Sequence, residues 1–464
     1  MTTCPLEPLA EAALPAGFCA FALPVEVSQV RTVVAVSGTA LLILERSQNA
    51  IVLLQDTDGD GVADTRRVLA LAPRLNHGLA LHNGYLYASS DTTVYRWSYR
   101  SSSSSSSDSD DESFTDISAQ PEIVINNINA NGQGGAPFGH TTRTLTFDKA
   151  GRLYVSVGSA GNVDQDSFRS RIRRFDLPSG TDAFPIDFLT GEVFADGLRN
   201  EVGLAWDRHG ILWGVENGAD NLQRQDLGGD ITNDNPAEEM HRFAHNEGSS
   251  SSPHYGYPYC WTEYLLPPEY GLGRGTVWAW PGVTRNGVAV TDTDCRENYA
   301  TAEVAMQAHS APLGITFYQY NDNLPDECNS NSTGGAFPPS MDGYAFIAFH
   351  GSWNRDIPTG YKVVYVAMDE NGHAAGQPVD LLAHAGTNAR WRDGFRPVDV
   401  DFDVCGRLLV TSDGTRNQGY GGSKVVRIEY HGESPVQSQV PSNSPSPSGE
   451  SEPLYSSSPT VSHL

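Results

Sequence analysis

An internal repeat is the feature of this sequence that most limits the possible folds. Six times along the chain, a polar or basic residue opens an alternating apolar strand, and a turn containing glycine leads to a second strand. A strand pair of this kind is the sequence pattern of a β-hairpin. The copies start near Arg31, Asn76, His140, Arg199, His309 and Arg396.

The repeat predicts an all-β fold, a six-bladed β-propeller. The copies recur at intervals of roughly 50 to 110 residues, and no helical stretch of comparable strength lies between them. A two-sheet sandwich is the alternative. Because a sandwich would not explain why a basic or amide residue opens every copy at the same place, the repetition favours the propeller.

Composition divides the chain into three parts. We expect an N-terminal segment over residues 1–24, the propeller domain over residues 25–431, and a disordered tail rich in serine and proline over residues 432–464. Within the domain, residues 101–112 are a serine run followed by acids, and we expect a disordered loop there.

The charge of the chain excludes several kinds of partner. The formal net charge is −26, from 56 acidic and 30 basic residues, which argues against binding to nucleic acid or to anionic membranes. No run approaches the ~18 apolar residues that a membrane span needs, so we expect no membrane partner. The sequence makes no prediction of the oligomeric state.

The cysteines favour an oxidising compartment. They are even in number and show no CxxC pair of the zinc-binding kind, which favours disulfides. We expect Cys4 to pair with Cys19, and the other four cysteines allow three pairings. The protein is therefore expected to be extracellular or in the secretory pathway, although the sequence begins without a signal peptide. The C-terminal Ser462-His463-Leu464 weakly resembles a peroxisomal signal, which the cysteines contradict.

In a propeller, residues at the same position of each copy come together around the central axis. A ring of cationic side chains inside an acidic protein indicates a bound anion, whereas any one of them alone is more simply a surface ion pair. The ring consists of Arg31, His77, His140, Arg199, His309 and Arg396.

His140 is the candidate general base of this ring. Its neighbours Gly139 and Thr141 are small, and an ordinary histidine pKa of about 6.5 suits proton removal near neutral pH. Asp164 lies one strand further on and is expected to orient the histidine. Its alternative role is that of an ordinary turn aspartate.

Two segments are candidate metal sites. The segment from Asp56 to Asp64 has the acid and glycine spacing of a calcium-binding loop, but Arg67 stands where such a loop has glutamate. A solvated acidic turn is the alternative. The calcium-ligand set would be Asp56, Asp58, Asp60 and Asp64. In the second segment, the main-chain carbonyls of Gly218 and Ala219 are the candidate ligands.

The motifs together resemble one family, the soluble glucose/sorbosone dehydrogenases that use pyrroloquinoline quinone (PQQ), and within it the fungal-type pyranose dehydrogenases. The resemblance covers about residues 17–430 and depends on six motifs in order. They are Asp56-Thr-Asp-Gly-Asp-Gly-Val-Ala-Asp64, Gly158-Ser-Ala-Gly-Asn-Val-Asp164, Gly197-Leu-Arg-Asn200, Glu216-Asn-Gly-Ala-Asp220, His309-Ser-Ala-Pro-Leu-Gly314 and Phe349-His-Gly-Ser-Trp-Asn-Arg355.

The resemblance implies PQQ above the channel of a six-bladed propeller, with a calcium ion beside it. His140 then takes the hydroxyl proton, Arg199 and Asn200 contact the quinone oxygens, and the carbonyls of Gly218 and Ala219 bind the calcium. The remaining cofactor-binding candidates are Arg31, His309, His350, Trp353, Arg355 and Arg396, of which Arg396 matches an arginine that holds a cofactor carboxylate.

The chain departs from the bacterial glucose enzymes at three places. Ser159 stands where those enzymes have an aspartate partner for the histidine, and Val398 stands at their second arginine. Their cofactor lysine has no clear equivalent, so His350 or Arg355 is expected to replace it, with Trp353 stacking on the ring. These differences favour the fungal-type branch.

The sequence therefore predicts a PQQ- and calcium-dependent oxidoreductase acting on CH-OH groups. It would oxidise pyranose sugars or related polyols by hydride transfer to the quinone and pass the electrons to an external acceptor such as a cytochrome or a quinone. The alternatives are a non-enzymatic propeller that binds a sugar or a partner, and a calcium-dependent lactonase.

Overall fold

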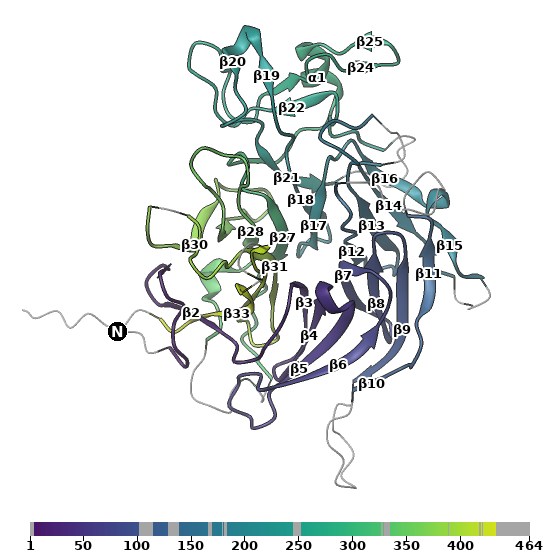
Figure 1. Cartoon of the computed structure of the whole chain (residues 1–464), viewed down its shortest axis with the longest axis vertical. Coiled ribbons are helices and arrows are strands. Elements are labelled where there is room, and N and C mark those ends of the chain that lie inside the picture. Colours follow the sequence, from purple (N-terminus) through teal and green to yellow (C-terminus); the bar gives the residue numbers. More distant parts are fainter. Residues whose placement is uncertain are drawn as a thin grey trace, which may run out of the picture.

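The computed structural model describes residues 4–101, 115–128, 139–165, 169–178, 180, 183–244, 252–325, 328, 335–387, 389–416, 419 and 421–432. The chain forms a six-bladed β-propeller, as the sequence predicts (Figure 1). The predicted disorder falls mainly on residues 102–114 and 433–464, which lie outside the described residues. Among the described residues, no helix is long and apolar enough to cross a membrane.

The first three blades are antiparallel sheets, each entered through its innermost strand. Blade 1 contains β3 (Val30–Ser37), β4 (Ala40–Glu45), β5 (Ala50–Gln55) and β6 (Thr65–Leu71). Blade 2 contains β7 (Leu75–His82), β8 (Tyr85–Ser90), β9 (Val94–Ser101), β10 (Thr115–Ile117) and β11 (Glu122–Asn126), with β15 (Ile186–Asp187) parallel to β11. Blade 3 contains β12 (Leu145–Phe147), β13 (Leu153–Val157), β14 (Arg171–Phe175) and β16 (Glu192–Asp196).

The last three blades continue the pattern. Blade 4 contains β17 (Glu201–Trp206), β18 (Leu212–Glu216), β21 (Glu238–Phe243) and β26 (Val304–Met306). Blade 5 contains β27 (Pro312–Phe317), β28 (Ala345–Phe349), β29 (Lys362–Val366) and β30 (Val379–His384), with β1 (Ala12–Ala13) at its outer edge. Blade 6 contains β31 (Pro397–Phe402), β32 (Leu408–Asp413), β33 (Ser423–Tyr430) and β2 (Phe18–Ala22). The six predicted hairpins are the two inner strands of the six blades.

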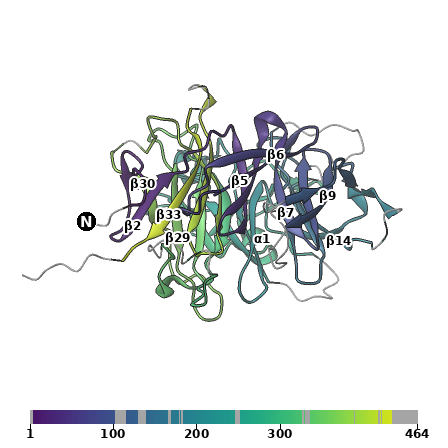
Figure 2. The same cartoon turned by 90° about the horizontal axis from the view of Figure 1, so that it is seen from below.

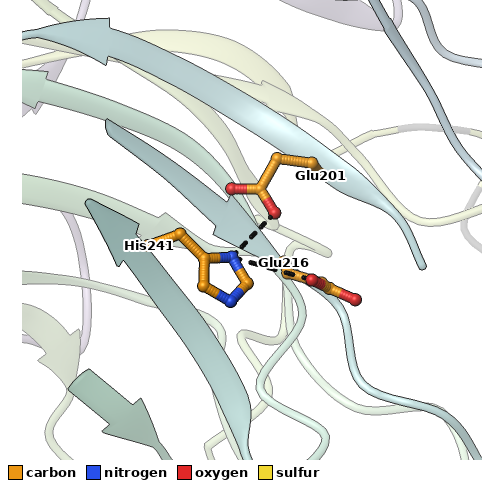
Figure 3. A group of neighbouring side chains, drawn as sticks. All are labelled: Glu201, Glu216 and His241. Carbon is orange, nitrogen blue, oxygen red and sulfur yellow. Dashed lines mark hydrogen bonds and ion pairs between the residues drawn. The ribbon is translucent and has the colours of Figure 1, made fainter. Parts of the chain in front are cut away.

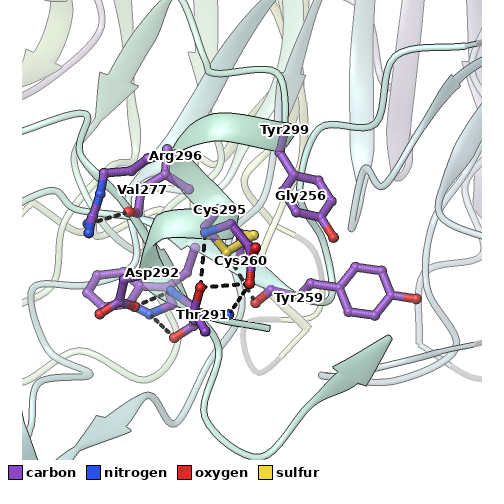
Figure 4. The surroundings of a disulfide bond; sticks show 12 residues. Gly256, Tyr259, Cys260, Val277, Thr291, Asp292, Cys295, Arg296 and Tyr299 are labelled. Carbon is purple, nitrogen blue, oxygen red and sulfur yellow. Dashed lines mark hydrogen bonds between the residues drawn. A yellow bond between two sulfur atoms is a disulfide. The ribbon is translucent and has the colours of Figure 1, made fainter. Parts of the chain in front are cut away.

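A small insert extends blade 4 beyond the ring, at the top of Figure 1. It contains β19 (Gln223–Arg224), β20 (Gly229–Asp230), β22 (Cys260–Thr262), β23 (Val277–Ala279), β24 (Thr284–Arg285), β25 (Val288–Ala289) and helix α1 (Asp292–Asn298). Thr291 and Asp294 form a capping box that starts α1, because each side chain accepts the other's backbone N–H. The disulfide between Cys260 and Cys295 joins β22 to α1 (Figure 4).

The N-terminal segment takes part in the propeller. β2 pairs with β33 as the outer strand of blade 6, and the two strands lie side by side in Figure 2. β1 pairs with β30 of blade 5. The predicted disulfide between Cys4 and Cys19 is confirmed, and the pairing that the sequence left open is Cys260–Cys295 and Cys328–Cys405. The ends of the described chain thus meet in blade 6, which closes the ring.

The hydrophobic core lies between the blades. Each of six buried clusters joins two neighbouring blades; for example, Leu42 of blade 1 and Leu86 of blade 2 share one cluster. At the axis, residues of all six innermost strands line a cavity of about 190 Å³. Because these strands all run in the same direction along the axis, their first residues gather on one face of the propeller.

Phe21 tests the contribution of β2 to ring closure. Its side chain is fully buried in the cluster between blades 6 and 1. We expect Phe21→Ala to lower the free energy of unfolding by about 3–5 kcal/mol, because the change leaves a cavity between two blades. Denaturant unfolding measures the loss. Val379→Ala is the control, since Val379 lies on the outer strand of blade 5 and is 48% exposed; equal losses for the two variants would contradict the closure role.

Candidate active site

The predicted ring residues gather at the face where the innermost strands begin. Arg31 and His77 are among the first three residues of β3 and β7. The other four lie up to five residues before an innermost strand: His140 before β12, Arg199 before β17, His309 before β27 and Arg396 before β31. Ion pairs place three of these residues in two groups, Arg31 in one and Arg199 and His309 in the other. One group centres on Asp413 and the other on Asp220.

Asp413 joins blades 1, 5 and 6. Its carboxylate accepts hydrogen bonds from Arg31 Nη1 at 2.8 Å and from His350 Nε2 at 2.9 Å. Burial alone would raise the pKa of Asp413, but the hydrogen bonds from His350 and Arg31 and the charge of Arg31 outweigh it and lower this pKa below its ordinary value. Burial, aided by Arg396, lowers the pKa of His350 to about 4. His350 is therefore neutral near pH 7.

Arg396 lies beside this group without a carboxylate partner. Its Nε donates to the carbonyl of His350 at 3.0 Å and its Nη2 to the carbonyl of Gly351 at 2.8 Å. Its guanidinium carbon is 5.4 Å from the ring centre of Tyr361. Among the described residues, no Asp or Glu forms an ion pair with Arg396. Carbonyl oxygens are thus the hydrogen-bond partners of this guanidinium among the described residues.

Asp220 holds the second group together. It accepts from Asn354 Nδ2 at 2.7 Å and lies 3.4 Å from both Arg199 Nη2 and His309 Nδ1. His309 Nε2 donates to the carbonyl of Thr232. Both ring nitrogens of His309 thus face atoms that can only accept. Burial lowers the pKa of His309, but Asp220 and Thr232 raise it above its ordinary value, so the ring carries a proton on each nitrogen.

Arg199 binds the loop that follows β18. Its Nη1 donates to the carbonyl oxygens of Asn217 at 3.1 Å and of Gly218 at 2.7 Å. Its Nε and Nη2 contact Asn162 at 3.2 and 3.1 Å. Asn200 Nδ2 donates to Asn217 Oδ1 at 3.1 Å. Arg199, Asn200 and the Gly218 carbonyl therefore lie together, as the sequence motifs predict.

His140 has a neutral ring with one available nitrogen. Its Nδ1 lies 2.9 Å from Ser159 Oγ and 3.1 Å from the Ser159 carbonyl oxygen. Because a carbonyl can only accept, Nδ1 carries the proton and Nε2 keeps its lone pair. Nε2 has no hydrogen-bond partner among the described residues. Burial and the charge of Arg199 lower the pKa of His140 to about 4. Nε2 is therefore unprotonated near neutral pH, and its lone pair is available.

The expected contact between Asp164 and His140 is not formed. The Asp164 carboxylate instead accepts from the backbone N–H of Ala160 at 2.7 Å and from Arg169 Nε at 2.8 Å. Ser159 takes the place beside the histidine, and its hydroxyl donates onward to the carbonyl of Gly161 at 2.7 Å. Asp164 therefore shapes the turn after β13 and does not touch the base.

The loop after β28 reaches over the Asp220 group. Arg355 pairs with Asp234, and Asp356 donates its backbone N–H to Asn233. Trp353 in the same loop is 73% exposed, so its indole is not packed into the protein. The next residue, Asn354, donates to Asp220, so Trp353 adjoins a residue of the Asp220 group in sequence.

The acidic loop of blade 1 lies away from the ring. Asp56, Asp58 and Asp60 bring ligand atoms within 4.8 Å of one another, and Thr57 Oγ1 donates to Asp64 at 2.9 Å. The backbone of Asp56 bonds to Thr39, in the turn at the far end of β3. Because the ring lies at the near end of β3, this cluster is on the opposite face of the propeller.

The motifs in the sequence did not indicate that Asp220 and Asp413 form ion pairs with the cationic residues of the ring. A signal for them exists, because an acidic residue closes the second strand in several copies of the repeat, at Glu45, Asp91, Glu216 and Asp413. The contact of Asp220 with His309 had no such signal, since it depends on how the loop after β18 folds back.

The chain is similar to several fungal proteins. A family model described as TrAA12-like matches residues 12–418. A pyrroloquinoline quinone-dependent sugar dehydrogenase of Hypocrea jecorina is 31% identical over 411 residues, which is 83% of each chain. A pyrroloquinoline quinone-dependent pyranose dehydrogenase of Coprinopsis cinerea is 28% identical over 82% of this chain and 50% of that protein. The chain spans about half the length of this second relative.

Two solved structures share the fold over most of the chain. The calcium structure of a Trichoderma reesei protein of family AA12 has a TM-score of 0.73 and 27% identity, and it covers 93% of this chain and 100% of that one. The holo form of the PQQ domain of a Coprinopsis cinerea pyranose dehydrogenase has a TM-score of 0.71 and 25% identity, with 92% and 100% covered.

The pKa values of His140 and His309 should be shifted in opposite directions from the ordinary histidine value. In the protein without cofactor, we expect His140 to stay neutral as the pH falls from 7 to 5 and to take up a proton near pH 4, because burial and Arg199 oppose its charge. His309 should stay charged above its ordinary pKa, because Asp220 favours its charge. NMR of histidine-labelled protein, assigned with His140→Gln and His309→Gln, measures both. A His140 signal that titrates at or above pH 6.5 would contradict this assignment.

Proposed function

The chain belongs to the TrAA12-like family, and from this premise we propose that it is a PQQ- and calcium-dependent oxidoreductase that oxidises pyranose sugars or related polyols. The observation that carries the proposal is the neutral ring of His140, whose Nδ1 is held by Ser159 and whose Nε2 lone pair is available. The names of the relatives from Hypocrea jecorina and Coprinopsis cinerea support the same cofactor and substrate class.

The residues present fit an anionic, planar cofactor. PQQ carries carboxylates, and Arg396 offers a guanidinium that no described carboxylate neutralises. Two residues of the cationic ring have a buried nitrogen without a hydrogen-bond partner among the described residues, Arg31 Nε and His77 Nδ1. The exposed indole of Trp353 is suited to stacking on a flat ring. We assign PQQ binding to Arg31, Arg199, Asn200, His309, His350, Trp353, Arg355 and Arg396.

The carbonyls of Gly218 and Ala219 are suited to the calcium ion. Calcium binds oxygen ligands, main-chain carbonyls included. The Gly218 N–H is held by Glu238 Oε2 at 2.7 Å, which fixes the orientation of this residue. We assign a second, structural calcium to the loop of Asp56, Asp58, Asp60 and Asp64, where Asp56 already accepts the N–H groups of Gly59 and Gly61.

The chemistry follows from the state of each side chain. Bound PQQ supplies the acceptor for the hydride that leaves the substrate carbon. His140 Nε2 takes the proton of the substrate hydroxyl, and Nδ1 donates to Ser159, which keeps the ring oriented while it is charged. The charge of Arg199 acts on His140, and we assign to it the stabilisation of developing negative charge. Arg396 holds an anionic group in place.

The proposal includes an electron acceptor and a cellular compartment. Electrons leave through an external acceptor such as a cytochrome or a quinone. The three disulfides fit the extracellular space or the secretory pathway. The net charge of −26 disfavours nucleic acid and anionic membranes as partners.

Replacement of the base separates binding from turnover. We expect His140→Gln to keep PQQ bound and to lower turnover of pyranoses by a factor of about 10² to 10⁴, because the general base is lost. PQQ absorbance titration measures binding, and dye reduction with a panel of sugars measures turnover. The absence of saturable PQQ binding to the unaltered protein would overturn the proposal. Ester or lactone cleavage without PQQ would favour a lactonase instead.

Gly158 tests the close packing of the site. A Cβ at this position would come within 2.6 Å of both Asn200 Oδ1 and His140 Cβ. We expect Gly158→Ala to displace both side chains and to weaken PQQ binding at least about tenfold, because the geometry of such a site tolerates little displacement. Gly161→Ala is the matched control, since a Cβ there would meet no atom of the described residues within 4 Å. Equal PQQ affinities of the two variants would show that the contact does not matter.

A further inference from the structure

Three buried side chains in blade 4 form a cluster that the proposed reaction does not use. Glu201, Glu216 and His241 come from the adjacent strands β17, β18 and β21 and point toward one another (Figure 3). Their side chains are 2%, 4% and 0% exposed. One ligand atom from each lies within 4.8 Å of the others.

Atoms of this cluster lack the partners that buried polar groups need. Glu201 Oε1, Glu216 Oε2 and His241 Nε2 are buried and form no hydrogen bond with the described residues. Among the residues that the structure describes, no arginine or lysine forms an ion pair with Glu201 or Glu216. Two carboxylates buried side by side without a counter-charge are costly, because each ion loses its hydration. The arrangement therefore favours a positive charge between them.

We propose that Glu201, Glu216 and His241 bind a divalent transition metal ion of the zinc type. His241 Nδ1 and Glu201 Oε2 form a hydrogen bond of 3.2 Å, which the metal would replace, and His241 Nδ1 lies 3.7 Å from Glu216 Oε2. Ligand atoms of a tetrahedral zinc site lie about 3.4 Å apart, because the bonds are about 2.0–2.2 Å long. A nitrogen ligand with two carboxylates selects such a metal over calcium, which prefers oxygen ligands alone.

Neighbouring groups hold the ligands in the required orientation. Glu216 Oε1 accepts the backbone N–H of Arg199 at 2.5 Å. Glu239 Oε2 lies 3.7 Å from His241 Nε2, and Glu239 is itself held by Thr262. A carboxylate behind the ring of a metal-bound histidine is a common supporting group. Gly214 leaves room for the Glu201 carboxylate, since a Cβ there would collide with Oε1.

A small cavity adjoins Glu216, one of the three proposed ligands. It has a volume of about 20 Å³, and Glu216, Glu239 and Tyr255 are among its lining residues. This is room for a water molecule, which would complete a four-coordinate metal with three protein ligands. The metal would tie the ends of β17 and β18 together, directly beside Arg199, Asn200 and Gly218, and so position these residues.

Metal analysis of the protein tests the site without any cofactor or substrate. After dialysis against zinc and then against metal-free buffer, we expect about one zinc ion per chain, a higher melting temperature than the chelated protein, and the visible absorption of tetrahedral cobalt after cobalt exchange. Glu201→Gln and His241→Gln should lose the zinc, and Glu239→Gln should bind it at least about tenfold more weakly.

Asp58→Asn is the matched control, because it alters the other acidic cluster and should leave the zinc content unchanged. The proposal is overturned if the unaltered protein retains no zinc or cobalt, or if Glu201→Gln retains as much as the unaltered protein. Metal content and the cobalt spectrum of the unaltered protein decide the question even where a variant does not fold. A failure to bind PQQ would leave the zinc result unaffected, so the two proposals fail separately.

Discussion

Packing between neighbouring blades is the constraint on which the rest of the structure depends. A single blade does not bury a core of its own, because each of the six clusters around the ring is shared between two blades. The ring therefore has to close, and β2 closes it by pairing with β33. Closure also builds the site: Arg31 of blade 1 and Asp413 of blade 6 are 382 residues apart in the chain and form an ion pair at 2.8 Å.

The closed ring brings cations together, and the structure balances most of them. Asp413 pairs with Arg31 and also accepts a hydrogen bond from the neutral His350, and Asp220 pairs with Arg199 and His309. These carboxylates allow the cations to be buried, since an unpaired buried charge would be costly. Among the described residues, Arg396 is left with carbonyl partners only. This balance explains how an acidic protein can bury several cations around its axis while Arg396 is left without a carboxylate partner among the described residues.

The repeat was sufficient to predict the six-bladed propeller, because strand alternation and turns are local features of the sequence. The motifs likewise identified the family resemblance, which the family match over residues 12–418 confirms, and the pairing of Cys4 with Cys19 was also predicted. The contacts between side chains at the site were harder to predict from the sequence. The contact expected of Asp164 is made by Ser159 instead, and this choice depends on how a turn folds. The cluster of Glu201, Glu216 and His241 depends on strand register, which places Glu201 opposite Glu216.

The two site histidines show why position in the repeat does not determine chemical role. His140 and His309 open equivalent copies, yet their surroundings shift their pKa values in opposite directions. His140 is half-buried beside Arg199 and meets a hydroxyl and a carbonyl, so its ring stays neutral and keeps one lone pair. His309 lies between the Asp220 carboxylate and the Thr232 carbonyl, so both of its nitrogens are protonated. Only a neutral imidazole can accept a proton, and this difference is why we propose His140 as the base and an anion-binding role for His309.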